Sequence, residues 1–407
     1  MISLASAARC ASAVKSAGCR RMTTNDPLRP DWDPRSDAVL RDQLAAYDDM
    51  RERCPVAHSD FLGWSLFRHA DITRVLNDPE AFSNVVSRHR AVPNGMDPPE
   101  HTEYRRILDP YFEPGRMAVF EPVCRAIAAG LTKKLLERDE VEFVCEFAES
   151  FAVQVQCAFL GWPPDMHEPL RLWTRKNQEA TRAQDRARMT EIAGEFDGYI
   201  DELLRVRRKA GAEASDDVTT SLLHARVRNR PLRHEEIVSI LRNATVGEVG
   251  TISAAVGILA HFLAENPDSQ RQFRERPSVL LAATEEVLRM HGPLVANRRI
   301  TTRPADIGGR KIGAGESISI IWISANRDER VFEDPKTFRL DRDPAPNLLY
   351  GAGIHVCPGA PLARLEMRVA MEELLGRTKR FNLIPHKPPT NAVYPASGFA
   401  ALPMRVE

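Results

Sequence analysis

Apolar residues recur at helical spacing through most of the chain. Stretches of this kind cover residues 116–137, 140–160, 188–209, 233–265, 278–290 and 360–376, and each predicts an amphipathic helix. Shorter strand-like runs lie at residues 64–68, 317–323 and 401–406, near glycine-rich turn signals. The pattern therefore predicts a mainly α fold with small β-sheets.

The stretch 233–265 differs from the others because it is apolar nearly all round. Between residues 242 and 261 its only ionisable side chain is Glu248, so the helix is predicted to run through the core. It should end before Pro267, because the residue before a proline avoids the helical conformation. Three glycines each cost about 1 kcal/mol relative to alanine in a helix and indicate either close packing or a local widening of the helix; they are Gly247, Gly250 and Gly257.

The chain shows one boundary, close to its N-terminus. No repeat, low-complexity tract or linker divides the rest, and the polar stretch 211–217 is short enough for a loop between helices. We expect residues 26–407 to form a single domain. Residues 1–25 are expected to be a disordered tail, or to precede the true start at Met22; a targeting segment is the alternative, since residues 1–21 carry four basic residues and no acid.

Charge and cysteine usage narrow the class of protein. Lys plus Arg and Asp plus Glu both total 56, so neither nucleic acid nor an anionic membrane is an expected partner. No apolar run reaches the roughly 18–20 residues of a membrane span, and no membrane anchor is expected. The seven cysteines are an odd number without paired spacing, which favours a reducing cytoplasm.

One cysteine, Cys357, lies in a glycine-rich loop whose sequence is typical of a functional site. Residues 350–359, Tyr-Gly-Ala-Gly-Ile-His-Val-Cys-Pro-Gly, place Cys357 just before an amphipathic helix. Glycines let the backbone take positive φ and approach a flat ligand, while free N–H groups at a helix N-terminus stabilise a thiolate. A buried cysteine alone is usually an inert core residue. This loop instead predicts a thiolate able to bind iron.

The loop resembles the haem-binding signature of cytochromes P-450, in which Phe, two glycines, a basic residue, Cys and Gly stand at this spacing. The resemblance implies haem b (iron protoporphyrin IX) between the central helix and this loop, with Cys357 as the axial ligand. It also places Tyr350 and Gly351 beside the haem and His355 on a propionate. Tyr350 replaces the usual Phe, and its added hydroxyl bears on the redox potential of the iron.

Further segments agree with the family in order along the chain. Glu286 and Arg289 resemble its Glu-x-x-Arg helix motif, and Arg342 matches the arginine that completes that ion-pair network. These residues are expected to be structural.

Two further basic segments match the family's propionate contacts. His101 and Arg105 lie four residues apart on one helix face, where both can donate to a carboxylate. They resemble the propionate-binding helix. Arg299, on the strand after the Glu-x-x-Arg helix, matches a further propionate-binding arginine.

The segment 247–251, Gly-Glu-Val-Gly-Thr, resembles the oxygen-activation segment of the family. The resemblance implies that Thr251 guides protons toward dioxygen at the haem. The family usually has an acid directly before this threonine, where the chain has Gly250. Glu248, three residues before Thr251, shares its side of the helix. It either takes over proton delivery, as a desolvated carboxyl that holds its proton tightly, or is a structural buried carboxyl.

The resemblance as a whole implies a bacterial-type soluble monooxygenase that binds a small organic substrate over the distal haem face, inserts one atom of dioxygen and reduces the other to water. Segments resembling the family's substrate-contact regions are residues 82–95, 173–183, 241–248, 294–297 and 396–399; they do not reveal the substrate. The 247–251 segment is also similar to that of bacterial haem domains fused to reductases.

No flavin, nicotinamide or iron–sulfur motif is present, so electrons are expected from a ferredoxin and ferredoxin reductase or an equivalent donor. A basic patch is expected to dock that acidic carrier; it comprises Arg106, Arg116, Arg364 and Arg368. Two alternatives stay open: a peroxide-driven enzyme of the same fold and a non-catalytic haem-thiolate sensor.

Overall fold

The computed structural model describes residues 30–87, 90–210, 217–394 and 396–407. The interpretation of residues 1–25 as a tail therefore lies outside the described residues, and the single domain over residues 26–407 stays a prediction.

Helices make up most of the described chain, as predicted. They are α1 (Asp37–Arg41), α2 (Gln43–Arg53), α3 (His69–Leu76), α4 (Glu100–Leu108), α5 (Pro114–Leu135), α6 (Ser150–Leu160), α7 (His167–Ala183), α8 (Arg186–Ala210), α9 (Val218–His224), α10 (His234–Glu265), α11 (Pro267–Glu275), α12 (Leu280–His291), α13 (Trp322–Ala325) and α14 (Ala360–Arg377). The strands are short and gather in small sheets, which confirms a mainly α fold.

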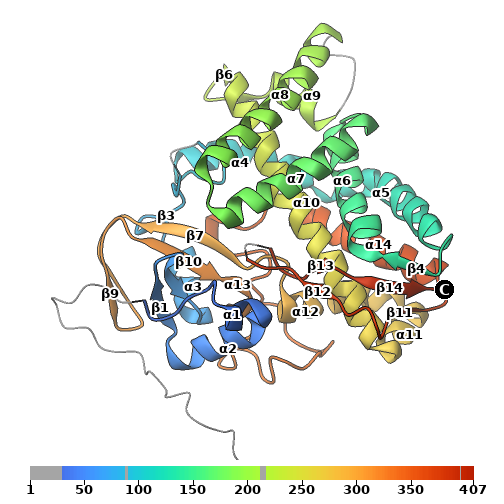
Figure 1. Cartoon of the computed structure of the whole chain (residues 1–407). Helices are drawn as coiled ribbons and strands as arrows, with labels where there is room; N and C mark the ends of the chain where they lie inside the picture. The colour runs from blue at the N-terminus through green and yellow to red at the C-terminus, as the bar shows by residue number, and fades with distance from the viewer. Residues whose placement is uncertain (1–29, 88–89, 211–216, 395) are drawn as a thin grey trace, which may run out of the picture.

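The largest sheet has the strand order β1-β2-β10-β7-β3 and lies to the left of α10 in Figure 1. It comprises β1 (Val56–Ser59), β2 (Gly63–Leu66), β3 (Phe82–Ser83), β7 (Ala296–Thr301) and β10 (Ser317–Ile321). The antiparallel register of β7 and β10 sets Arg299 opposite Ile318. The pairing of β7 with β10 therefore fixes the position of Arg299 in the sheet.

The remaining strands form smaller pieces. They are β4 (Glu140–Glu142), β5 (Arg226–Val227), β6 (Arg230–Pro231), β8 (Ala305–Ile307), β9 (Arg310–Ile312), β11 (Phe381–Leu383), β12 (Thr390–Asn391), β13 (Phe399–Ala401) and β14 (Pro403–Val406).

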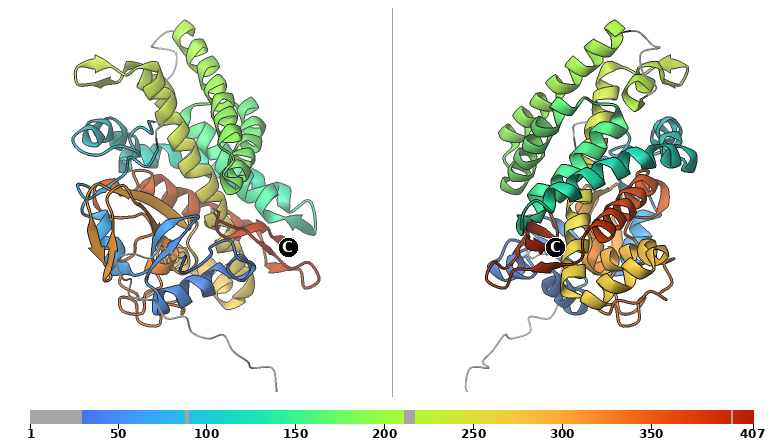
Figure 2. Two further views of the ribbon diagram at one scale, coloured as in Figure 1. Left: turned by 60° about the vertical axis from the view of Figure 1, so that its left-hand side comes forward. Right: turned by 90° about the vertical axis from the view of Figure 1, so that its right-hand side faces the viewer.

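Helix α10 runs through the middle of the molecule in every view (Figures 1 and 2) and matches the predicted stretch 233–265 within one residue. In the described part of the chain it is the one helix long and apolar enough to cross a bilayer, which corrects the expectation that no stretch has that length. Within the fold, 56% of its most apolar window is buried. Burial of this kind is typical of a core helix.

Gly250 allows a second helix to approach α10 closely. A Cβ at this position would lie 3.3 Å from Nε2 of Gln178 on α7. The close packing predicted from the glycines of α10 is therefore confirmed at Gly250, whereas nothing lies within 4 Å of the corresponding point at Gly247.

The helix predicted over residues 140–160 is wrong in its first part. Residues Glu140–Glu142 form β4, which pairs with β14, and a π-helix over Val144–Glu149 precedes α6. Local periodicity cannot show this pairing, because the partner strand lies at the other end of the chain. Helix α7 was missed because few of its residues are apolar; those buried are Leu170, Trp173 and Ala180.

Candidate functional site

The loop before α14 has the glycine conformations that its sequence predicts. Gly351 and Gly353 have φ of +74° and +68°, a region that favours glycine. A Cβ on Gly353 would lie 2.4 Å from the backbone oxygen of Leu76. The N–H of Cys357 donates to the carbonyl of Tyr350 at 2.9 Å, so the loop is closed on itself around the cysteine.

The sulfur of Cys357 lies at the N-terminus of α14 and keeps accessible surface. The surrounding protein desolvates the thiol and raises its pKa, while the N–H groups of Gly359 and Ala360 donate to the sulfur and oppose that rise. Arg105 and Arg364 also favour the thiolate through their charge. The chain thus presents an accessible sulfur whose anionic form is stabilised by backbone donors.

Three basic side chains lie together at this loop, two of them buried and His355 partly buried. His101 of α4 and Arg299 of β7 are 3% and 6% exposed, and the ring centroids of His101 and His355 lie 4.1 Å apart. Burial lowers the pKa of His355 to about 3 and that of Arg299 to about 10. The pKa of His101 is lowered by burial and by the charge of Arg105.

The cluster of His101, Arg299 and His355, called the basic cluster below, has unused donor capacity. In the described part of the chain, Nδ1 of His101 and Nε2 of His355 have no hydrogen-bond partner. The guanidinium of Arg299 donates to the carbonyl of Arg298 at 2.8 Å and forms no ion pair with a described acid. Because arginine cannot shed its charge, such a site calls for an anion. The two propionates of a haem fit it.

Arg105 lies at the same loop but in a different arrangement. Its Nε donates to Asp109 at 2.6 Å and its Nη1 to the carbonyl of Val356 at 3.0 Å. The side chain therefore stabilises the Cys357 loop. Its contact with a haem propionate stays a prediction.

Thr251 and Glu248 point to different partners. Oγ1 of Thr251 donates to the carbonyl of Gly247 at 2.7 Å. The carboxyl of Glu248 lies beside Glu366 of α14, and the Gln156 amide nitrogen, turned toward Glu248, donates to its Oε1 at 3.1 Å. No hydrogen bond between the described side chains joins Thr251 to Glu248, so their joint role stays a prediction.

Glu366 and Gln156 are both 0% exposed and were not identified from the sequence. Burial raises the pKa of Glu366 to about 8. It raises that of Glu248 well above its usual range, with a further contribution from the charge of Glu366. The sequence held a signal for Glu366, since it stands four residues after Leu362 and four before Ala370, two buried residues of α14.

The predicted ion-pair network is confirmed. Arg289 contacts both carboxylate oxygens of Glu286 at 2.7 and 2.9 Å, and Arg342 contacts the same carboxylate at 2.9 Å. Arg289 also donates to the carbonyl of Asn326 at 2.6 Å. Because Arg289 and Glu286 are nearly inaccessible to solvent, the network ties α12 to the chain before the Cys357 loop.

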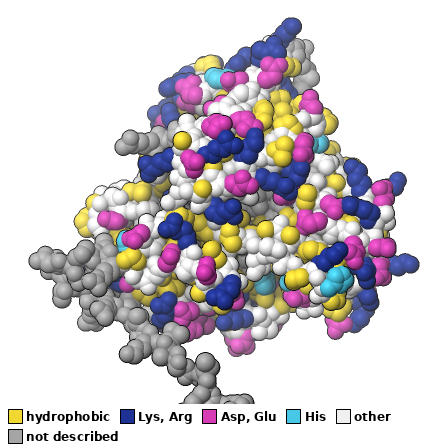
Figure 3. Space-filling model, viewed as in Figure 1, with side chains coloured by type: hydrophobic (Ala, Val, Ile, Leu, Met, Phe, Trp, Pro, Cys, Tyr) yellow, Lys and Arg dark blue, Asp and Glu magenta, His cyan; other side chains and the backbone are white. Residues whose placement is uncertain are grey.

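The expected basic patch is partly neutralised by acids. Arg364 pairs with Glu285 at 2.6 Å, and Arg368 pairs with Glu121 at 2.6 Å. The side chain of Arg106 is 72% exposed. On the face shown in Figure 3, basic and acidic side chains are interspersed, in keeping with the zero net charge.

The regions expected to contact substrate include exposed apolar side chains. Val85 and Val86 are 53% and 42% exposed, and Val246 of α10 is 46% exposed. Trp173, at the start of another such region, lies in the core and donates to the carbonyl of Ile192 at 2.8 Å. It is therefore a packing residue.

Known proteins resemble the chain over most of its length. The cytochrome P-450 family model matches residues 172–404, which include α10 and the Cys357 loop. The chain is similar to linalool 8-monooxygenase of Pseudomonas putida, 30% identical over 343 residues, or 79% of this chain and 84% of that protein. Cyclomarin C epoxidase of Salinispora arenicola is 31% identical over 353 residues, covering 82% and 88%.

Solved structures agree with this likeness. The crystal structure of CYP109E1 from Bacillus megaterium in complex with testosterone superposes with a TM-score of 0.80 at 26% identity, covering 89% of this chain and 99% of that one.

Proposed function

This chain belongs to the cytochrome P-450 family and is a monooxygenase, and we propose that it inserts one atom of dioxygen into a small organic substrate with electrons from separate redox proteins. The observation that carries the proposal is the pairing of an exposed Cys357 at a helix N-terminus with a basic cluster that forms no ion pair with any described acid. Both features fit one ligand, a haem.

The residues present fit haem b. Cys357 would bind the iron, the basic cluster would hold the propionates with Arg105 beside it, and Tyr350 and Gly351 would lie along the proximal side. When bound, the haem would supply dioxygen activation, and the Cys357 thiolate as its ligand would favour that chemistry.

The substrate is proposed to be a small, largely apolar organic molecule. Val85, Val86 and Val246 expose apolar surface in the regions expected to contact it. Burial of such surface contributes about 25 cal/mol per Å² to binding. The relative named linalool 8-monooxygenase is in keeping with a substrate of that chemistry.

Thr251 and Glu248 are proposed to handle protons for the reaction. Oγ1 of Thr251 holds its proton in a bond to Gly247, from which it can rotate toward a ligand, and Glu248 holds a proton on its buried carboxyl. Thr251→Ala should retain substrate binding and divert electrons into hydrogen peroxide. Glu248→Gln should slow the proton-dependent step and alter the solvent isotope effect.

Electrons are proposed to come from a ferredoxin and its reductase or an equivalent donor. Arg106 is 72% exposed and lies 3.9 Å from Glu103, whereas Arg364 and Arg368 are less exposed and form closer ion pairs with Glu285 and Glu121. The buried position of α10 favours a soluble protein, and a cytoplasmic location is part of the proposal.

The proposal is tested by following the haem spectrum during titration with small apolar molecules, then measuring dioxygen consumption and product with a ferredoxin system. We expect a spectral shift on binding and incorporation of one atom of labelled dioxygen into the product. Product formation with hydrogen peroxide but not with reductase would favour the peroxide-driven alternative. Haem reduction without any dioxygen consumption would favour the sensor.

A further inference from the structure

Two glutamates, one on α10 and one on α14, lie side by side where these helices pack together; they are called the carboxyl pair below. The carboxyl of Glu248 on α10 lies beside that of Glu366 on α14; Glu366 is fully buried and Glu248 is half-buried. Such contacts between two carboxyls normally oppose folding, because two buried like charges repel each other and each loses its hydration. A carboxyl pair therefore needs either a base or a proton.

No base serves this pair. Neither Glu248 nor Glu366 forms an ion pair with a described Lys, Arg or His. The Gln156 amide donates to both oxygens of Glu248, whereas neither oxygen of Glu366 receives a donor from another described residue. The only hydrogen that can lie between the two acids is one carried by a carboxyl itself.

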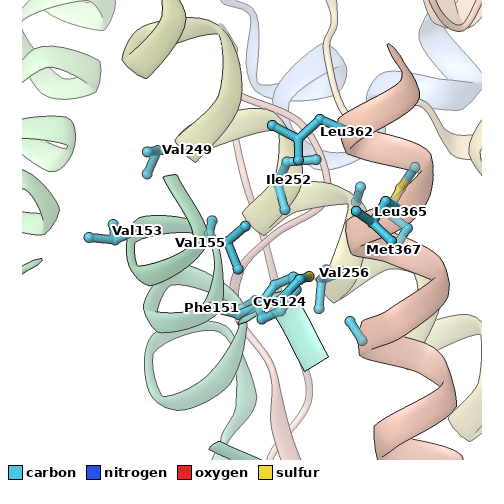
Figure 4. Close-up of a cluster of buried hydrophobic side chains, with 14 of the residues drawn as sticks. Cys124, Phe151, Val153, Val155, Val249, Ile252, Val256, Leu362, Leu365 and Met367 are labelled. Carbon is cyan, nitrogen blue, oxygen red and sulfur yellow. The ribbon is translucent and has the colours of Figure 1, made fainter. Parts of the chain in front are cut away.

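Apolar side chains make up most of the surroundings of the pair. Neighbours of Glu248 and Glu366 along their helices belong to a buried cluster where α6, α10 and α14 meet (Figure 4); those drawn include Val249, Ile252, Leu365 and Met367. Among the titratable groups that interact electrostatically with the pair, Cys124 of α5 interacts with both acids, Cys157 of α6 with Glu248, and Tyr350 with Glu366. Glu248 in turn senses the charge of Cys357.

We propose that Glu248 and Glu366 share one proton, so that Glu366 is a positioning residue that keeps a proton beside Glu248 at neutral pH. The pair then carries a single negative charge, and its proton bridges one oxygen of each carboxyl. Gln156 orients Glu248 for this bond. The inference rests on the proposed role of Glu248 in proton delivery and deepens it, because the store lies one helical turn from Thr251.

Infrared difference spectroscopy of the haem-loaded protein tests the inference without turnover. A protonated carboxyl has a C=O stretch well separated from the bands of a carboxylate, and this stretch shifts in D2O. We expect wild-type protein to retain a buried band of this kind at pH 7. In Glu366→Gln the introduced amide donates to Glu248, so the remaining band should titrate at least about one pH unit lower.

Glu248→Gln should shift the band in the same direction. Glu265→Gln is the matched control, since it removes a half-exposed carboxyl from the same helix (side chain 55% exposed) and should leave the band in place. If a single variant folds poorly, the double variant Glu248→Gln with Glu366→Gln keeps the volume, allows amide-to-amide hydrogen bonding, and should abolish the band.

A wild-type protein without the band at pH 7, or a band unchanged in the double variant, overturns the shared proton. Either result leaves the proposed monooxygenase standing, because dioxygen incorporation is measured separately. Conversely, a protein that shows the band but consumes no dioxygen would contradict the proposed function and not the shared proton.

Discussion

The basic cluster and the carboxyl pair each bring groups of one kind together inside the protein, and neither forms an ion pair with an opposite charge among the described residues. His101, Arg299 and His355 lie on α4, β7 and the Cys357 loop. Glu248 and Glu366 lie inside two long helices that pack on each other. Ionisable groups without an ion-pair partner thus lie at two places inside the protein, one beside a loop and one between helices.

The chemistry of the groups separates the two solutions. Arginine stays protonated in proteins, so the cluster around Arg299 is satisfied only by an anion from outside. A carboxyl can take up a proton, so the pair of Glu248 and Glu366 neutralises itself. We infer that the basic cluster is a ligand site and that the carboxyl pair is a proton store.

The buried ion pairs of Glu286 provide a reference for the free-energy cost of leaving a buried charge without its partner. Glu286 accepts from Arg289 and Arg342 in the core. Glu286→Gln leaves buried cations with half their compensation and should cost about 3–5 kcal/mol of unfolding free energy. Urea denaturation measures this, with Glu333→Gln as control because Glu333 is 81% exposed and pairs with Arg339. A loss under about 1 kcal/mol would show that burial here does not strengthen charge pairing.

Arg299→Met separates a ligand site from a structural cation. Loss of a charged hydrogen bond to a propionate should weaken haem binding by about 1.5–3 kcal/mol, or roughly 10- to 100-fold. The haem-free protein should not lose stability, because an uncompensated buried charge is removed. Haem transfer to an excess of apomyoglobin measures the first effect and thermal unfolding of the haem-free protein the second. Arg298→Met, at the exposed neighbour, is the control.

The opposite result would be equally clear. If Arg299→Met destabilises the haem-free protein and leaves haem retention unchanged, Arg299 supports the fold and does not hold the ligand.

The difference between the two regions also explains what the sequence could predict. His101, Arg299 and His355 were predicted as a set because the resemblance to known haem-binding segments identifies each one separately. Helices α10 and α14 were predicted within about two residues, because their apolar patterns are continuous and local. These features need no knowledge of what packs against them.

The carboxyl pair could not be predicted in this way, because it depends on which helices pack against each other. Glu248 was recognised as an acid in an apolar helix, but its partner comes from α14, and only the packing of α14 on α10 brings Glu366 to it. Gln156 comes from α6 in the same way. The ion pair of Arg105, in contrast, could be predicted from local sequence, because Asp109 follows it by four residues, a spacing at which helix side chains pair.

Opposite pH dependence provides a further test of the comparison. Glu366 has its pKa raised from 4.5 to about 8, so the folded state binds more protons than the unfolded state between these values. Its contribution to stability is present below pH 4.5 and is lost as the pH rises toward 8, at up to about 1.4 kcal/mol per pH unit. Relative to Glu366→Gln, wild-type protein should lose stability over that range.

His355 should act in the other direction. Its pKa falls from 6.5 to about 3, so its contribution is present above pH 6.5 and is lost as the pH falls toward 3. Relative to His355→Gln, wild-type protein should lose stability on acidification. Urea midpoints of the three proteins at pH 5, 6.5 and 8 measure both trends, and slopes of the same sign would contradict the comparison.

The smallest effect is expected at Tyr350. Its hydroxyl is buried without a partner in the described part of the chain, and Arg364 lies 4.5 Å above its ring. Tyr350→Phe removes an unsatisfied hydroxyl and should stabilise the protein by about 1 kcal/mol, with a shift in the reduction potential of the haem. Thermal unfolding and redox titration measure these changes; a loss of stability would show that the hydroxyl has a partner.

The carbon monoxide spectrum of the reduced, haem-loaded protein tests the central claim, that Cys357 binds the haem iron through its thiolate. Wild-type protein should give the strongly red-shifted band of thiolate-bound ferrous haem, and Cys357→Ser should lose that band. Persistence of the red-shifted band in Cys357→Ser would show that another residue is the ligand and would contradict the assignment.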